Sequence, residues 1–173
     1  HIDNESLTRD QEGWVQLLDE RLRKRLAQLL GEPATIWRDP SLEGNVEITS
    51  TLLSKIETVG FLVSVLSPRY VKSPWCVREL TEFCRHAASH GGLVVRGKSR
   101  VFKVVKTFIP RETHPPEIQD LLGYEFYESD KVSGRVREFD PNGTKYWEKF
   151  EDLAQDISKL IEPLTGQSKG TIY

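Results

Sequence analysis

The feature that most constrains the fold is the segment 59–66, which reads Val-Gly-Phe-Leu-Val-Ser-Val-Leu. It is nearly all apolar and rich in β-branched side chains. A strand that is apolar on both faces is typical of a parallel sheet with helices packed on both sides. The segment therefore predicts a strand buried on both faces at the centre of the fold.

The segments around this strand alternate between helix and strand patterns. Apolar residues recur at helical spacing in 8–30, 48–56, 75–89 and 147–161, and strand patterns cover 34–37, 100–109 and 121–127. The strand at 100–109 alternates in polarity, which places it nearer a sheet edge, and 67–74, with its two prolines, reads as a loop. This order predicts an α/β fold with a parallel sheet and helices on both faces.

Composition excludes several classes of function. The 173 residues carry 24 Lys and Arg against 26 Asp and Glu, so a whole-chain binder of nucleic acid or of an anionic membrane surface is not expected. Apolar runs are far shorter than the ~20 residues of a membrane span. The histidines and cysteines show no metal-ligand spacing, and neither a phosphate loop nor a dinucleotide glycine fingerprint occurs.

The two cysteines indicate a reducing compartment. Cys76 and Cys84 are eight residues apart on a predicted helix, a rise of roughly 12 Å, and a disulfide needs Cα atoms within about 7 Å. They are therefore expected to be small buried hydrophobes in a cytoplasmic protein.

The candidate chemistry lies where the buried strand ends. Open α/β sheets bind ligands at the carboxyl ends of their strands, and Trp75 and Glu79 follow this one, four residues apart and so on one helix face. We expect Glu79 in the first turn of the helix, where the positive helix end favours its ionised form. A fixed carboxylate can stabilise the positive charge that builds on a sugar when an N-glycosidic bond breaks, and an indole can stack on a flat ring.

The spacing alone is a weak signal, because Trp147 and Glu151 repeat it in the last helix. There Trp147 continues the apolar stripe, so we interpret that second pair as structural.

The sequence around Glu79 resembles that of a Toll/interleukin-1 receptor (TIR) domain, especially of the bacterial and plant kind. The matching segments are Trp37 to Gly44, the predicted helix that begins at Ile48, and Ser67 to Leu80. The resemblance covers Ile2 to about Leu164, so 1–164 is expected to be the domain, and 165–173 a linker and the possible start of a following domain. It implies a five-stranded parallel sheet of the flavodoxin type.

The resemblance also implies an activity, because many members of this family cleave NAD⁺ to nicotinamide and ADP-ribose or a cyclic ADP-ribose. Carried over, Glu79 is the catalytic residue and Trp75 lines the pocket for nicotinamide and its ribose. The residues that match nearby substrate-binding positions are Ser73, Tyr70, Trp37 and Asp39. NAD⁺ is then the substrate, and neither a cofactor nor a metal is expected.

The family resemblance implies partners as well. Members complete their sites by self-association of TIR domains, and fused domains in the parent chain are expected, as in an effector of bacterial antiviral or stress defence. The alternative is a non-catalytic adaptor that binds other TIR domains through the loop Asp39–Glu47. A receiver-like domain is a weak third interpretation, because the early acidic cluster is missing.

One departure from the family concerns the first strand. A TIR domain begins with an apolar strand at the centre of the sheet, but residues 1–4 here resemble the loop that follows it. The first central strand is therefore expected upstream of His1, and without it two strands would be separated by about 9.6 Å. His1 is expected to lie near the ligand.

Overall fold

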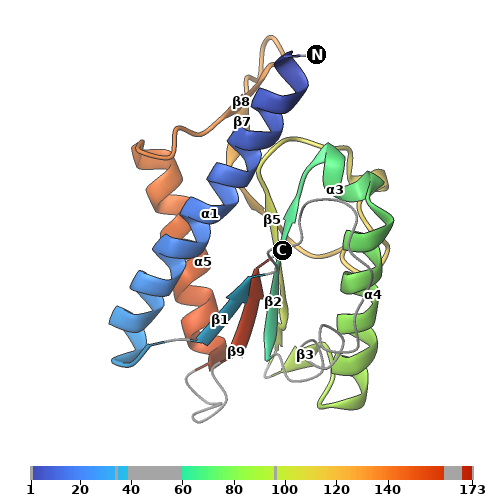
Figure 1. Ribbon diagram of the computed structural model, residues 1–173, viewed down its shortest axis with the longest axis vertical. Coiled ribbons are helices and arrows are strands. Elements are labelled where there is room, and N and C mark those ends of the chain that lie inside the picture. Colours follow the sequence, from blue (N-terminus) through green and yellow to red (C-terminus); the bar gives the residue numbers. More distant parts are fainter. Residues whose placement is uncertain (1, 34, 39–59, 96, 162–168, 173) are drawn as a thin grey trace.

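The protein is a parallel sheet covered by helices on both faces (Figure 1). The computed structural model describes residues 2–33, 35–38, 60–95, 97–161 and 169–172. The sheet order is β1 (Thr35–Arg38), β9 (Lys169–Ile172), β2 (Phe61–Leu66), β5 (Val101–Val105) and β6 (Tyr124–Glu125), and all neighbours are parallel. This confirms the predicted α/β class.

Two apolar cores lie on opposite faces of this sheet. On one face, α1 (Ile2–Leu30) and α5 (Thr144–Ile161) pack on β2 and β5, with Leu18 and Leu22 of α1 fully buried. On the other face, α4 (Pro74–Ser89) buries Leu80 and Phe83 against the same strands. Successive side chains of β2, and likewise of β5, therefore point alternately into the two cores.

The predicted double burial of β2 is confirmed, since all six of its residues are buried. The strand predicted at 100–109 lies nearer an edge than β2, next to the edge strand β6, but it is not an edge strand itself. β5 runs between β2 and β6, and its five residues are all buried. The alternation misleads because Lys103, a charged residue in the middle of the strand, is only 4% exposed.

The slot expected for a missing first strand is filled. β9 lies between β1 and β2, and its backbone pairs in register with both, Thr171 facing Trp37 on one side and Leu62 on the other. Residues 169–172, within the segment 165–173 that the sequence predicts to be a linker and the possible start of a following domain, thus form a strand of this sheet. An empty slot would leave two rows of backbone donors and acceptors without partners, which is costly inside a protein.

Several shorter elements differ from the sequence prediction. Residues 67–74 are not a loop throughout, because α3 (Pro68–Lys72) is a short helix. Two small hairpins join β3 (Val94–Val95) to β4 (Lys98–Ser99) and β7 (Tyr127–Ser129) to β8 (Val136–Glu138), and a 3-10 turn spans Arg111–Thr113. The helix predicted at 48–56 lies outside the described residues.

The last helix buries a different aromatic residue from the one predicted. Trp147 is 42% exposed and lies under the guanidinium of Arg21, 4.4 Å from its ring centroid. Tyr146 takes the core position with 0% exposure. The pair Arg25 and Glu151, 2.6 Å apart, also joins α1 to α5, so Glu151 has a structural partner.

Replacing Thr171 by proline tests the position of β9. Proline cannot donate its ladder hydrogen bond, and inside a sheet this should lower the free energy of unfolding by about 3 kcal/mol. Urea unfolding followed by circular dichroism measures the change. Val132→Ala, at a side chain 98% exposed on the β7–β8 turn, is the control and should change stability by less than about 0.5 kcal/mol. Equal stability of both variants would mean that β9 does not pair within the sheet.

Candidate active site

The site is built around the point where α4 begins. Two Ser-Pro steps set this local structure, because Ser67 and Ser73 each cap a helix whose first residue is proline. The Oγ of Ser67 accepts a hydrogen bond from the Tyr70 N–H at 3.2 Å, and the Oγ of Ser73 accepts one from the Cys76 N–H at 3.3 Å. These caps fix the turn between the carboxyl end of β2 and α4.

Glu79 is a buried carboxylate, with 3% of its surface exposed. It lies in the second turn of α4, not in the first as predicted, because it is the sixth residue of a helix that begins at Pro74. The helix dipole acts mainly on the first turn, so it favours the ionised form of Glu79 less than the sequence suggested.

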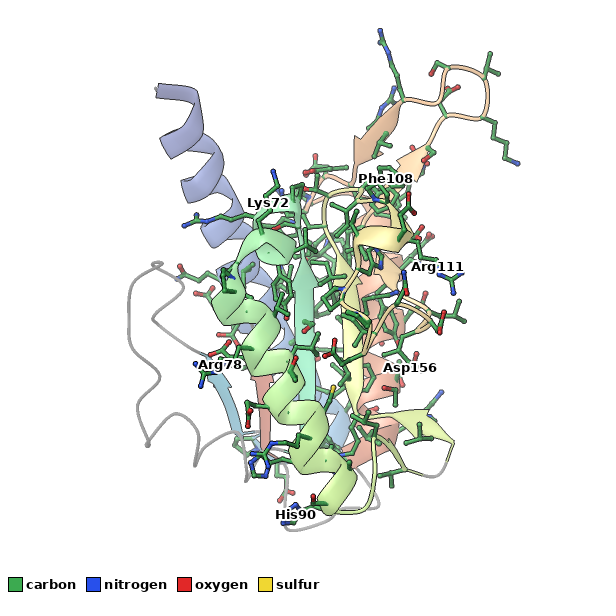
Figure 2. The ribbon with its side chains drawn as sticks, turned by 90° about the vertical axis from the view of Figure 1, so that its right-hand side faces the viewer. Lys72, Arg78, His90, Phe108, Arg111 and Asp156 are labelled. Carbon is green, nitrogen blue, oxygen red and sulfur yellow. The ribbon has the colours of Figure 1, made fainter. Side chains whose placement is uncertain are left out.

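The flank of α4 that carries Glu79 faces the β1 side of the sheet. Thr81 lies on the opposite flank, where its hydroxyl donates to Glu117 at 2.9 Å, in the segment that joins β5 to β6. Residues two positions apart in a helix differ by about 200° around its axis. Glu79, two residues before Thr81, therefore points to the opposite side, toward β9 and β1. Figure 2 shows α4 between these strands on one side and the segment of Arg111 on the other.

α4 follows the carboxyl end of β2, the central strand in the order β1-β9-β2-β5-β6. In open α/β sheets, ligands bind beyond the carboxyl ends of the strands. Glu79 therefore lies on a helix that begins at the edge of the sheet where a ligand site is expected in this fold class.

Tyr70 lies directly behind the start of α4. Its ring is 6% exposed, and its hydroxyl is 3.0 Å from Ser64 Oγ on β2 and donates to the Cys76 carbonyl at 3.3 Å. Burial raises the pKa of Tyr70, and the nearby negative charge of Glu79 raises it further. The phenol therefore stays protonated over the whole physiological range.

The structure thus brings Glu79, Tyr70 and Ser73 together at one end of α4. Trp75 is the second residue of this helix, one turn before Glu79, and Trp37 is the third residue of β1. Asp39 and His1 lie outside the described residues. Ser73 and Tyr70 have local structural partners, and binding of substrate by Ser73, Tyr70, Trp75, Trp37, Asp39 and His1 remains a prediction.

A second buried polar cluster escaped the sequence analysis. The ammonium of Lys103 on β5 lies 3.3 Å from His114 Nδ1 and donates to the carbonyl of Ile118 at 3.1 Å. An ammonium has donors only, so Nδ1 of His114 must accept, and the proton sits on Nε2, 3.2 Å from the Ile109 carbonyl. The sequence of β5 did carry one signal of this cluster, because a lysine in the middle of a buried strand needs hydrogen-bond acceptors for its ammonium.

Other features of the surface lie away from Glu79. A hollow of about 560 Å³ lies beside the β7–β8 hairpin, and one of about 510 Å³ lies between β6 and α5. Neither is lined by a residue that the sequence places in the site. In the described part of the chain, no His, Cys, Asp or Glu cluster of three or more is suited to a metal ion. No helix in the same residues is long and apolar enough to cross a membrane.

Comparison with protein families supports the assignment of the fold. Residues 21–96 match the family model of the TIR domain. This segment runs from α1 to β3 and includes both stretches on which the resemblance was based. Over these residues the chain is therefore similar to the TIR family, as the sequence resemblance predicts. No curated protein and no solved structure matches the chain.

The cysteines are expected to be chemically inert in the folded protein. Cys76 and Cys84 are 7% and 8% exposed, and burial raises the pKa of Cys84 to about 11. Because the thiolate is the reactive form, alkylation by iodoacetamide at pH 8 should be at least about tenfold slower than in urea. Intact-mass analysis over time measures the two rates. Rapid labelling of the folded chain would contradict the buried positions.

His114 should make stability depend on pH. Burial and then the charge of Lys103 lower the pKa of His114 below 6.5. The unfolded chain therefore binds a proton more readily, and this contribution to stability is complete above pH 6.5 and is lost as the pH falls through the lower folded-state pKa.

Urea unfolding at pH 7.5 and pH 5.5 checks this expectation. His114→Gln should reduce the stability difference between the two pH values, while His90→Gln, at an exposed position, should leave it unchanged. An equal pH dependence in all three proteins would show that His114 does not titrate as its contacts indicate.

Proposed function

We propose that this TIR domain is an NAD⁺ glycohydrolase in which Glu79 is the catalytic residue. The observation that carries the proposal is the 3% exposure of Glu79, on the helix that follows the carboxyl end of β2. The resemblance of the Ser67–Leu80 stretch to catalytic members of the family supports it.

The proposed reaction breaks the bond between C1′ of the ribose and the nicotinamide nitrogen. Nicotinamide takes the bonding electron pair and leaves as a neutral base, so no general acid is needed. The sugar becomes cationic in the transition state, and the carboxylate of Glu79 stabilises this charge. Water then adds to C1′ and loses a proton, which gives ADP-ribose, or an internal nucleophile of the nucleotide adds instead and gives a cyclic product.

Burial makes the carboxylate more effective in this role. In a site that excludes water, a fixed negative charge acts on a developing positive charge with less screening than at the surface. Trp75, one helical turn away, would stack on the nicotinamide ring and so orient the bond that breaks.

The cellular setting follows from the family resemblance. Self-association with other TIR domains would complete the site, and the domain would act in the cytoplasm as an effector of a bacterial immune or stress response. NAD⁺ is the substrate in this scheme, and no additional cofactor takes part.

Replacing Glu79 by glutamine tests the proposal. The intact chain is incubated with NAD⁺ at high protein concentration, and released nicotinamide is measured by liquid chromatography. Glu79→Gln keeps the shape of the side chain but removes its charge, so turnover should fall by about a hundredfold or more. Circular dichroism should show that this variant remains folded.

Glu82→Gln is the matched control, because Glu82 lies on the same helix and pairs with Arg85 at 2.8 Å, outside the site. It should keep turnover within about twofold of the original chain. Equal turnover in the Glu79 variant would remove Glu79 from catalysis. Absence of nicotinamide from the unaltered chain, together with binding between copies, would favour the non-catalytic adaptor.

A further inference from the structure

We infer that Tyr70 is a positioning residue: its buried phenol fixes the first turn of α4, and with it Glu79, against strand β2. The inference rests on the proposed function for its effect on catalysis, but the geometry that carries it is independent of the substrate. It assigns Tyr70 a role different from the substrate contact that the resemblance implies.

Tyr70 is bonded to the start of α4 at two points. Its carbonyl accepts a hydrogen bond from the Ser73 N–H at 3.0 Å, and its hydroxyl donates to the Cys76 carbonyl at 3.3 Å. Ser73 is the N-cap of α4 and Cys76 lies in its first turn. One residue thereby holds both the cap and the first turn of the helix that carries Glu79.

The same hydroxyl connects the helix to the sheet. A phenol has one proton, and Tyr70 donates it to Cys76, so at 3.0 Å the hydroxyl of Ser64 must be the donor to Tyr70. Ser64 is on β2 and is 0% exposed. The resulting chain of hydrogen bonds runs from β2 through Tyr70 to α4, in a setting where such bonds are strong and directional.

These contacts leave Tyr70 little capacity to bind substrate. Its ring is packed in the apolar core under α4, and its hydroxyl already has a donor and an acceptor. Tyr70 holds the cap and the first turn of α4, and Glu79 lies in the next turn of the same helix. A shift of α4 on loss of the phenol would therefore move the carboxylate and change its surroundings.

Tyr70→Phe tests this role, with Tyr124→Phe as the matched control. Tyr124 also carries a partly buried phenol that joins the sheet to a helix, through Asp156 of α5 at 2.6 Å, but on the other core. Both variants should show similar losses of thermal stability. Tyr70→Phe should lower kcat about tenfold to a hundredfold with little change in KM, because small displacements of a catalytic group have such effects. Tyr124→Phe should leave kcat within about twofold.

Ser64→Ala gives an intermediate test, since Tyr70 keeps its bond to Cys76 while losing its donor. Its loss in kcat should be smaller than that of Tyr70→Phe, and the double variant should be no worse than Tyr70→Phe alone. A rise in KM with unchanged kcat in Tyr70→Phe would overturn the inference in favour of a substrate contact. Equal losses of kcat in the Tyr70 and Tyr124 variants would also overturn it.

Carbon-13 NMR of the glutamate carboxyl groups gives a readout that does not depend on turnover. The titration of Glu79, identified by its loss in Glu79→Gln, should shift in Tyr70→Phe and remain unchanged in Tyr124→Phe. If the unaltered chain releases no nicotinamide, the proposed function fails, and this titration still decides the inference. An unshifted Glu79 resonance in Tyr70→Phe would refute it.

Discussion

The structure depends on the complete burial of β2. A strand covered on both faces can satisfy its backbone donors and acceptors only through strands on both of its edges, and here β5 and β9 provide them. The same burial extends to Ser64, whose hydroxyl must find a partner within the protein and finds Tyr70. The order of the sheet and the position of α4 therefore both follow from one apolar segment of the chain.

Burying the carboxylate of Glu79 has an electrostatic cost, and the groups at the start of α4 are arranged around it. A carboxylate in a largely apolar layer is expensive to bury, and proteins accept this expense mainly where the charge has a purpose. Around it, the helix caps and the Tyr70 phenol consist of neutral groups with defined partners. These neutral hydrogen bonds fix the start of the helix that carries the carboxylate.

The parts of the fold that the sequence predicted are those with a strong apolar pattern. β2 and the buried face of α4 are examples, because burial alone determines their form. The prediction failed where a polar group lies inside, as with Lys103, since its partners come from a distant segment. It also failed at the start of the last helix, where Trp147 was predicted to lie in the core and the neighbouring Tyr146 is buried instead. The short helix α3 carried a local signal in its Ser-Pro step, but the two prolines suggested a loop instead.

The place of β9 in the sheet has a consequence for how the chain is made and folded. The strands on either side of β9 are synthesised well before it, so their facing edges emerge from the ribosome without a partner. Contacts between such distant parts of a chain form slowly, and strand edges that have no partner yet are prone to aggregation. Nascent chains of this protein would therefore be most in need of chaperone protection just before residues 169–172 appear.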